Sequence, residues 1–107
     1  MNYSQYEIII VNLDPTVGSE IKKTRPCIII SPNEMNVNLR TIVIAPLTST
    51  LKNYPTRVRI KFQNRESSIV LDQIRTIDKQ RIVKTAGRIK DVEIEKVKSV
   101  IKETYVE

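Results

Sequence analysis

The chain of 107 residues contains no histidine and no tryptophan, and it has a single cysteine, Cys27. Without histidine or a second cysteine, the usual zinc ligands and an intramolecular disulfide are both excluded. Cys27 begins an apolar run, which favours a buried, inert thiol over a nucleophile. A magnesium site would have to use Asp14, Glu20 and Asp72, but their spacing matches no known carboxylate motif. We therefore expect no metal and no other cofactor.

Long apolar runs are missing as well, and no segment approaches the length that a membrane-spanning helix needs. The first seven residues lack the basic and then apolar pattern of a signal peptide. A chain of this length corresponds to one domain and can bury enough surface to fold without staples. We expect a soluble, cytoplasmic protein with a single domain over residues 1–107.

The positive charge is concentrated in one part of the chain. The net charge is +6, yet residues 52–90 alone hold eleven lysines and arginines against three acidic residues. A concentrated positive region attracts polyanions and speeds their capture. The expected partner is therefore a nucleic acid or an acidic protein segment, and a merely solubilising surface is the competing interpretation.

Valine, isoleucine and threonine dominate several short segments, as they do in β-strands. In the segment 56–63, Val58, Ile60 and Phe62 would face a core. The residues that alternate with them, Arg57, Arg59 and Lys61, would form an ordinary solvated face. Residues 31–40 are expected to form a turn with one helical turn. The predicted strands are 7–13, 26–31, 41–47, 56–63, 67–73 and a short one near 86–89.

One convincing helix covers residues 91–105, with Asp91 as its predicted N-cap. Glu93 and Glu95 would form ion pairs with Lys96 and Lys98 on the solvent side. Several short antiparallel strands followed by one terminal helix predict a small twisted barrel. The apolar stripe that would pack on the sheet consists of Ile94, Val97, Val100, Ile101 and Tyr105.

Three blocks carry a resemblance to a known family. The first is a polar loop between two apolar strands, in which Leu13-Asp14-Pro15-Thr16 and Gly18-Ser19-Glu20 are followed by Thr24-Arg25-Pro26. The second is Ala45-Pro46-Leu47-Thr48-Ser49, and the third is Leu71-Asp72-Gln73-Ile74-Arg75-Thr76-Ile77-Asp78. In this order and spacing, the chain from Glu7 to the terminal helix resembles the MazF/PemK/Kid family of bacterial toxin ribonucleases.

The resemblance implies a fold, an activity and partners. The fold would be a mainly β, SH3-like twisted antiparallel barrel with a C-terminal helix, as in MazF and CcdB, acting as a homodimer. The activity would be metal-independent, sequence-selective cleavage of single-stranded mRNA, in which the 2′-OH attacks and leaves 2′,3′-cyclic phosphate and 5′-OH ends. An acidic antitoxin with a disordered tail would cover the RNA site.

Arg25 is the strongest catalytic candidate. Its planar guanidinium suits two-point contact with phosphate oxygens, and the resemblance assigns the central role to this arginine. Stabilising the charge of the transition state is the favoured role, because a guanidinium pKa above about 12 makes a free arginine a poor base. The resemblance also places Thr48 beside the phosphate as a donor, with Ser49 in support; closing a strand is the alternative role for both.

Asp72 follows an apolar run and could orient the arginine or accept the 2′-OH proton, while Arg75 could contact RNA or pair with Asp72. The remaining supporting or substrate-binding candidates are Ser19, Glu20 and Gln73. Some members of the family carry a histidine at the position of Ser19 and an arginine at that of Val70, so the general base is not fixed by the resemblance.

Two other functions compete with RNA cleavage. A CcdB-like toxin that binds gyrase would use an exposed tail with tryptophan and glycine. This chain ends Glu103-Thr104-Tyr105-Val106-Glu107, and the lack of tryptophan argues against that function. A non-catalytic SH3-like module that binds RNA would more often show exposed aromatic residues for base stacking. The chain has only five aromatic residues, and Phe62 and Tyr105 are predicted to be in the core.

Overall fold

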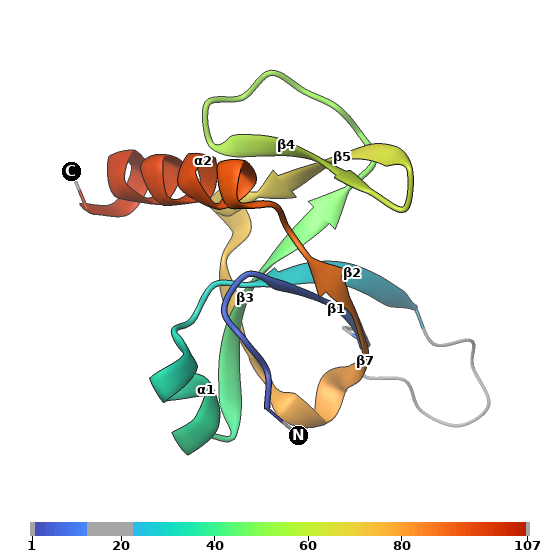
Figure 1. Ribbon diagram of the computed structural model, residues 1–107, viewed down its shortest axis with the longest axis vertical. Helices are drawn as coiled ribbons and strands as arrows, with labels where there is room; N and C mark the ends of the chain where they lie inside the picture. The colour runs from blue at the N-terminus through green and yellow to red at the C-terminus, as the bar shows by residue number, and fades with distance from the viewer. Residues whose placement is uncertain (1, 13–22, 107) are drawn as a thin grey trace.

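The computed structural model describes residues 2–12 and 23–106 and consists mainly of β-strands (Figure 1). Most of the strands form an antiparallel sheet in the order β4-β5-β3-β2-β1-β7, and β6 pairs with β3. The strands are β1 (Glu7–Asn12), β2 (Thr24–Ile29), β3 (Thr41–Thr48), β4 (Arg57–Phe62), β5 (Arg65–Val70), β6 (Arg75–Asp78) and β7 (Ile82–Arg88). The helical segments are α1 (Asn33–Asn38), α2 (Asp91–Ile101), the short turns η1 (Leu71–Gln73) and η2 (Lys79–Arg81), and a final π-helical turn, η3 (Lys102–Val106).

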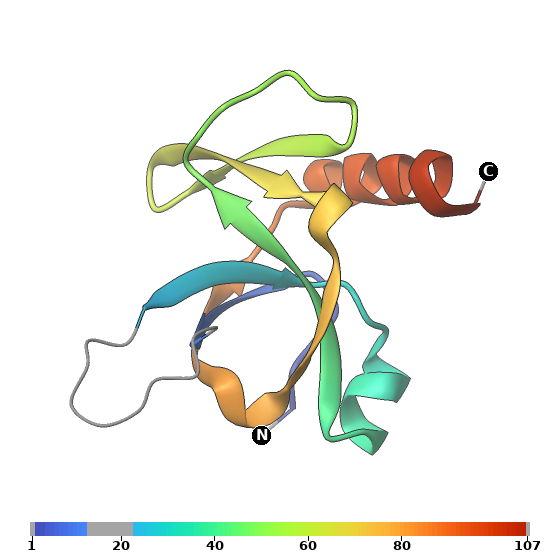
Figure 2. The same cartoon turned by 180° about the vertical axis from the view of Figure 1, so that it is seen from behind.

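The sheet curls into a half-barrel, and α2 lies across the end formed by β4 and β5 (Figures 1 and 2). The expected fold class, a small twisted antiparallel barrel with a C-terminal helix, is therefore confirmed. The expected helical turn between residues 31 and 40 is α1. No helix of the described residues is long and apolar enough to cross a membrane.

Both faces of the sheet bury apolar side chains, because neighbouring residues of a strand point to opposite faces. One set packs under α2 and includes Ile28, Leu47 and Ile69; we call it the helix-side core. The other set lies inside the curl and includes Ile29 and Ile44; we call it the inner core. Fully burying each such side chain stabilises the fold by roughly 1.5–3 kcal/mol.

Two local conformations set the path of the strands. Gln63 and Asn64 both have positive φ, 53° and 62°, as a two-residue hairpin turn between β4 and β5 requires. Gly87 has a φ of 117°, and the pairing of β1 with β7 shifts next to it, between Ile8 and Ile9. A bulge with glycine at the strained position bends this edge of the sheet.

Several predicted boundaries were wrong. The strand expected at 67–73 runs from Arg65 to Val70 and is followed by η1, and the strand near 86–89 is longer and starts at Ile82. The strand β6 was not predicted, because Ile77 is its single buried residue and gives no alternating pattern. The first part of β7 was not predicted for a similar reason, because none of the residues of this strand is fully buried.

The predicted details of the terminal helix also need correction. The α-helix ends at Ile101, and its N-cap is Lys90 rather than Asp91. Tyr105 is 53% exposed and is not part of the core; its hydroxyl donates a hydrogen bond to the carbonyl oxygen of Leu71. The ion pair of Glu95 with Lys98 is confirmed, at 3.5 Å.

Glu93 lies on the buried side of α2, not on the solvent side. One of its carboxylate oxygens accepts a hydrogen bond from the backbone N–H of Lys90 at 2.8 Å, and the other accepts one from the N–H of Lys61 at 3.3 Å. The first bond caps the helix, and the second satisfies the free edge of β4. Glu93 therefore fixes α2 to β4, and hydrogen bonds to a charged group are worth about 1.5–3 kcal/mol each.

Candidate active site

The register of β2 and β3 brings the two predicted catalytic residues together. Cys27 pairs with Pro46 and Ile29 with Ile44. Continuing this antiparallel register by two residues places Arg25 opposite Thr48, and directly opposed side chains lie on the same face of a sheet. Consistent with this, one cavity of about 240 Å³ is lined by Arg25, Pro26, Leu47, Thr48, Ser49 and Ser67.

Arg25 and Thr48 continue the inner face of the curl beyond its apolar core. Along β3, Ile42 and Ile44 belong to the inner core, and Thr48 follows them at even spacing. Along β2, Cys27 belongs to the inner core, and Arg25 precedes it by two residues. Arg25 is exposed and Thr48 is half-buried, so the polar pair stands at the mouth of the buried interior.

Arg75 lies on the same inner face. It pairs with Ile44 on β3, while Ile77, two residues further on, pairs with Ile42 and belongs to the inner core. Burial raises the pKa of the Cys27 thiol to about 11, and the charges of Arg25 and Arg75 both act to lower it. The two guanidinium groups are thus close enough to Cys27 for their charges to act on its thiol, and both are exposed.

The backbone and the hydroxyl of Thr48 are held by its own strand end. Thr48 pairs with Ser68 on β5, and its Oγ1 accepts a hydrogen bond from the N–H of Thr50 at 3.2 Å. Because the oxygen is the acceptor in this bond, the hydroxyl hydrogen is left to donate to a ligand. The geometry suits a donor aimed at a phosphate oxygen.

Asp72 is held by other partners than the sequence indicated. Thr56 Oγ1 donates a hydrogen bond to Asp72 Oδ1 at 3.0 Å, and Arg57 Nε lies 3.7 Å from the same oxygen. The guanidinium of Arg57 also lies 4.8 Å from the ring centroid of Tyr54. In the described part of the chain, Asp72 thus forms its ion pair with Arg57, and the pair with Arg75 that the sequence left open is not made.

Of the four remaining predicted site residues, two belong to the described part of the chain and two do not. Ser49 lines the cavity, and Gln73 is exposed in η1. Ser19 and Glu20 lie outside the described residues. The sequence did not indicate Ser67, a buried residue that contributes to the cavity wall. Its signal was weak, because a serine in a strand predicts nothing until the pairing partners of that strand are known.

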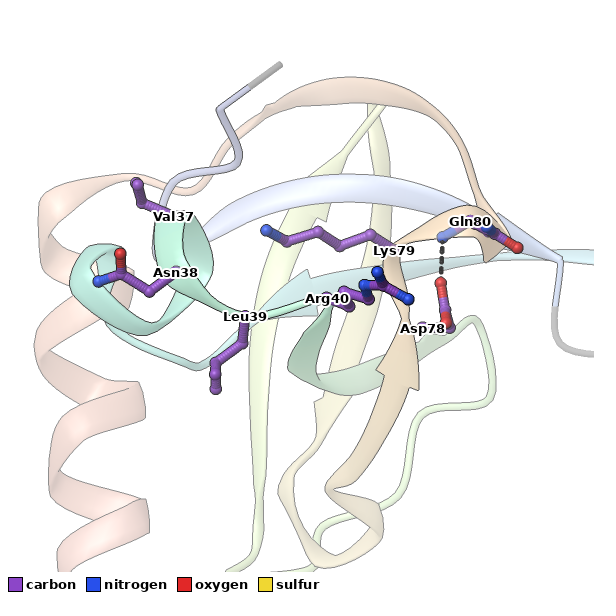
Figure 3. A pocket seen from close by; sticks show the side chains of 7 residues that line it. All are labelled: Val37, Asn38, Leu39, Arg40, Asp78, Lys79 and Gln80. Atoms are coloured by element: carbon purple, nitrogen blue, oxygen red, sulfur yellow. Dashed lines mark hydrogen bonds between the residues drawn. The ribbon is translucent and has the colours of Figure 1, made fainter.

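A second cavity, of about 400 Å³, lies near the other end of β3 (Figure 3). It is lined by residues 37–40 and 78–80, and its acidic residue Asp78 accepts a hydrogen bond from the backbone N–H of Gln80 at 2.8 Å. The amino group of Lys79 donates to the carbonyl oxygen of Asn36. Among the residues that the structure describes, no predicted site residue contributes to this cavity. The described residues also contain no group of three or more histidine, cysteine and acidic residues that could hold a metal ion.

The raised pKa of Cys27 predicts a loss of stability at alkaline pH. In the unfolded chain the thiol has its ordinary pKa of 9.0, but in the folded protein burial raises that pKa to about 11. The free energy of unfolding should therefore fall by about 2 kcal/mol more between pH 9 and 11 for the natural chain than for Cys27→Ala. Chemical denaturation of both proteins at several pH values measures the difference, and parallel curves would contradict it.

The family of this chain follows from its sequence relatives. The family described as PemK-like, MazF-like toxin of type II toxin-antitoxin system matches residues 4–105. Endoribonuclease EndoA of Bacillus subtilis is 34% identical over 97 residues, which are 85% of this chain and 84% of the relative. Endoribonuclease MazF of Staphylococcus saprophyticus is 31% identical over 101 residues, 89% of this chain and 84% of the relative.

Solved structures agree in fold. MazF from Deinococcus radiodurans superposes with a TM-score of 0.81 at 19% identity, covering 100% of this chain and 99% of the other. An endoribonuclease from a mycobacterial species, solved in complex with its cognate antitoxin, also gives 0.81 at 19% identity, covering 94% and 92%. With the match over residues 4–105, the chain belongs to the family of PemK-like, MazF-like toxins of type II toxin-antitoxin systems.

Proposed function

We propose that this chain is a metal-independent endoribonuclease that cuts single-stranded RNA at selected sequences. The observation that carries the proposal is the register that sets Arg25 opposite Thr48 in one cavity, with Arg75 on the same face. The named activity of the two relatives, both endoribonucleases, supports it.

In the proposed reaction, the 2′-oxygen of the RNA forms a bond to phosphorus while the bond from phosphorus to the 5′-oxygen breaks. One proton leaves the 2′-OH and one is taken up by the 5′-oxygen, so the products are a 2′,3′-cyclic phosphate and a 5′-OH. The Arg25 guanidinium stabilises the negative charge of the phosphorane, and the Thr48 hydroxyl donates to one of its oxygens. Asp72 is not assigned as the base, because Thr56 and Arg57 already occupy one of its oxygens.

The proposed partners follow from charge and from relatives. An acidic antitoxin segment suits the positive excess of residues 52–90, and related toxins have been solved with an antitoxin bound. We infer that its disordered tail covers the RNA site, that the toxin acts as a homodimer, and that it works on mRNA in the cytoplasm.

Cleavage of a long RNA in EDTA tests the proposed activity directly. We expect cleavage to persist in EDTA, because the chain has no histidine and its one cysteine is buried. The new ends should carry 2′,3′-cyclic phosphate and 5′-OH, because the 2′-OH attacks. Mapping the ends also gives the cleavage sequence. A requirement for Mg²⁺, or products with 5′-phosphate, would refute this mechanism.

The variant Arg25→Ala should lose about 10²–10³-fold in cleavage rate, because a donor to the developing charge is removed. The side chain is exposed, so the melting temperature should stay close to that of the natural chain. Arg25→Lys should also be slow, since an ammonium group cannot make the two-point contact. Single-turnover rates decide the matter, and a normal rate for Arg25→Ala would remove this residue from the site.

Thr48→Ala should slow cleavage about ten- to a hundredfold, whereas Thr48→Ser should be nearly normal. The hydroxyl, not the methyl group, would hold the phosphate, and a hydrogen bond to a charged group is worth roughly 1.5–3 kcal/mol. Melting curves for both variants separate this role from the hydrogen bond to Thr50. Equal rates for alanine and serine, with reduced stability, would make Thr48 a structural residue.

A further inference from the structure

A row of three polar residues crosses the sheet from the cavity to its edge. Thr48 on β3 pairs with Ser68 on β5, and Ser68 pairs with Arg59 on β4. Residues paired in this way point to the same face. The side chain of Arg59 therefore lies on the face that carries Thr48 and, through the register of β2 and β3, Arg25.

The apolar residues of β4 fix this orientation. Val58 and Ile60 are buried in the helix-side core, so the alternate residues must point to the opposite face. These alternate residues are Arg57, Arg59 and Lys61, which we call the β4 basic strip. The inner face is thus closed over its apolar core and opens, beyond Thr48, onto the basic strip.

The three cations of the strip differ in how far their charge is neutralised. Arg57 lies 3.7 Å from Asp72, and Lys61 stands opposite Glu66 in the register. Arg59 donates a hydrogen bond from Nη2 to Asn53 Oδ1 at 3.0 Å, and no ion pair links it to a carboxylate of the described residues. Since an amide carries no charge, Arg59 keeps its full positive charge on the face that carries Thr48.

Ser68, in the middle of the row, has an unusual environment. It is fully buried, and its Oγ has no hydrogen-bond partner among the described residues. Buried hydroxyl groups normally have a partner, because an unpaired polar group is costly to bury. The row from Thr48 to Arg59 is therefore polar throughout, although an apolar side chain at the position of Ser68 would be less costly to bury.

We propose that Arg59 binds a backbone phosphate of the RNA next to the scissile phosphate, so that the substrate runs from the cavity across β5 to β4. This inference rests on the proposed function. Two strand spacings, about 10 Å, separate the backbones of Arg59 and Thr48, and the long arginine side chain bridges part of that span. The Asn53 contact is exposed, so a phosphate can replace it.

The test uses an RNA oligonucleotide with the mapped cleavage sequence and a 2′-O-methyl group at the cut nucleotide, which blocks cleavage. Its phosphates are replaced one at a time by uncharged methylphosphonates. The natural chain should lose about tenfold in affinity at one phosphate beside the scissile one. Arg59→Ala should bind the unmodified RNA about tenfold more weakly and show no further loss at that phosphate. For Arg59→Ala, the slope of log affinity against log salt concentration should be less steep by about one.

Arg65→Ala is the matched control, because it removes the same charge from the same hairpin. Arg65 is exposed and pairs with Phe62, so it belongs to the helix-side face and should change RNA affinity less than twofold. The inference is refuted if Arg59→Ala changes RNA affinity as little as this control does. It is also refuted if Arg59→Ala still loses affinity when that one phosphate is replaced by a methylphosphonate. The same holds if Arg59→Ala weakens only the binding of an acidic antitoxin peptide. Failure of the natural chain to cleave RNA would instead reject the proposed function.

Discussion

The register between β2 and β3 is the constraint on which the candidate site depends. The side chains of a strand alternate with a period of two, so sliding β2 by one residue against β3 would move Arg25 to the face under α2, away from Thr48. The buried pair of Ile29 with Ile44 prevents the shift, because Ile29 would have to leave the inner core. Core packing thus fixes the relative position of Arg25 and Thr48, although no hydrogen bond joins them.

Placing cations at the mouth of an apolar interior has an electrostatic consequence. Arg25 and Arg75 are exposed and stay hydrated, yet they lie close enough to Cys27 for their charges to act on a thiol that is fully buried. A phosphate bound there would meet two positive charges beside a low-dielectric wall, where attraction is stronger than in bulk water.

The sequence predicted those parts that have a strong local pattern. The alternating run from Arg57 to Phe62 and the apolar spacing in α2 gave the correct element types, and the blocks around Arg25 and Thr48 gave residues that the structure brings together. The sequence did not predict β6 or the full length of β7, which bury few side chains. It also missed the partners of Asp72 and the inward position of Glu93, because these depend on which segments meet in three dimensions.

The charged face of β4 illustrates how structure and function share one pattern. Taken alone, alternating arginine and lysine residues indicate only a solvated surface. Val58 and Ile60 fix which face the basic residues occupy, because both pack under α2. Glu93 holds the same strand by accepting a hydrogen bond from the backbone N–H of Lys61. The basic residues are then held on the inner face by the core on the other side of the strand. Arg59 therefore needs no ion pair to orient it, and its charge is kept for a ligand.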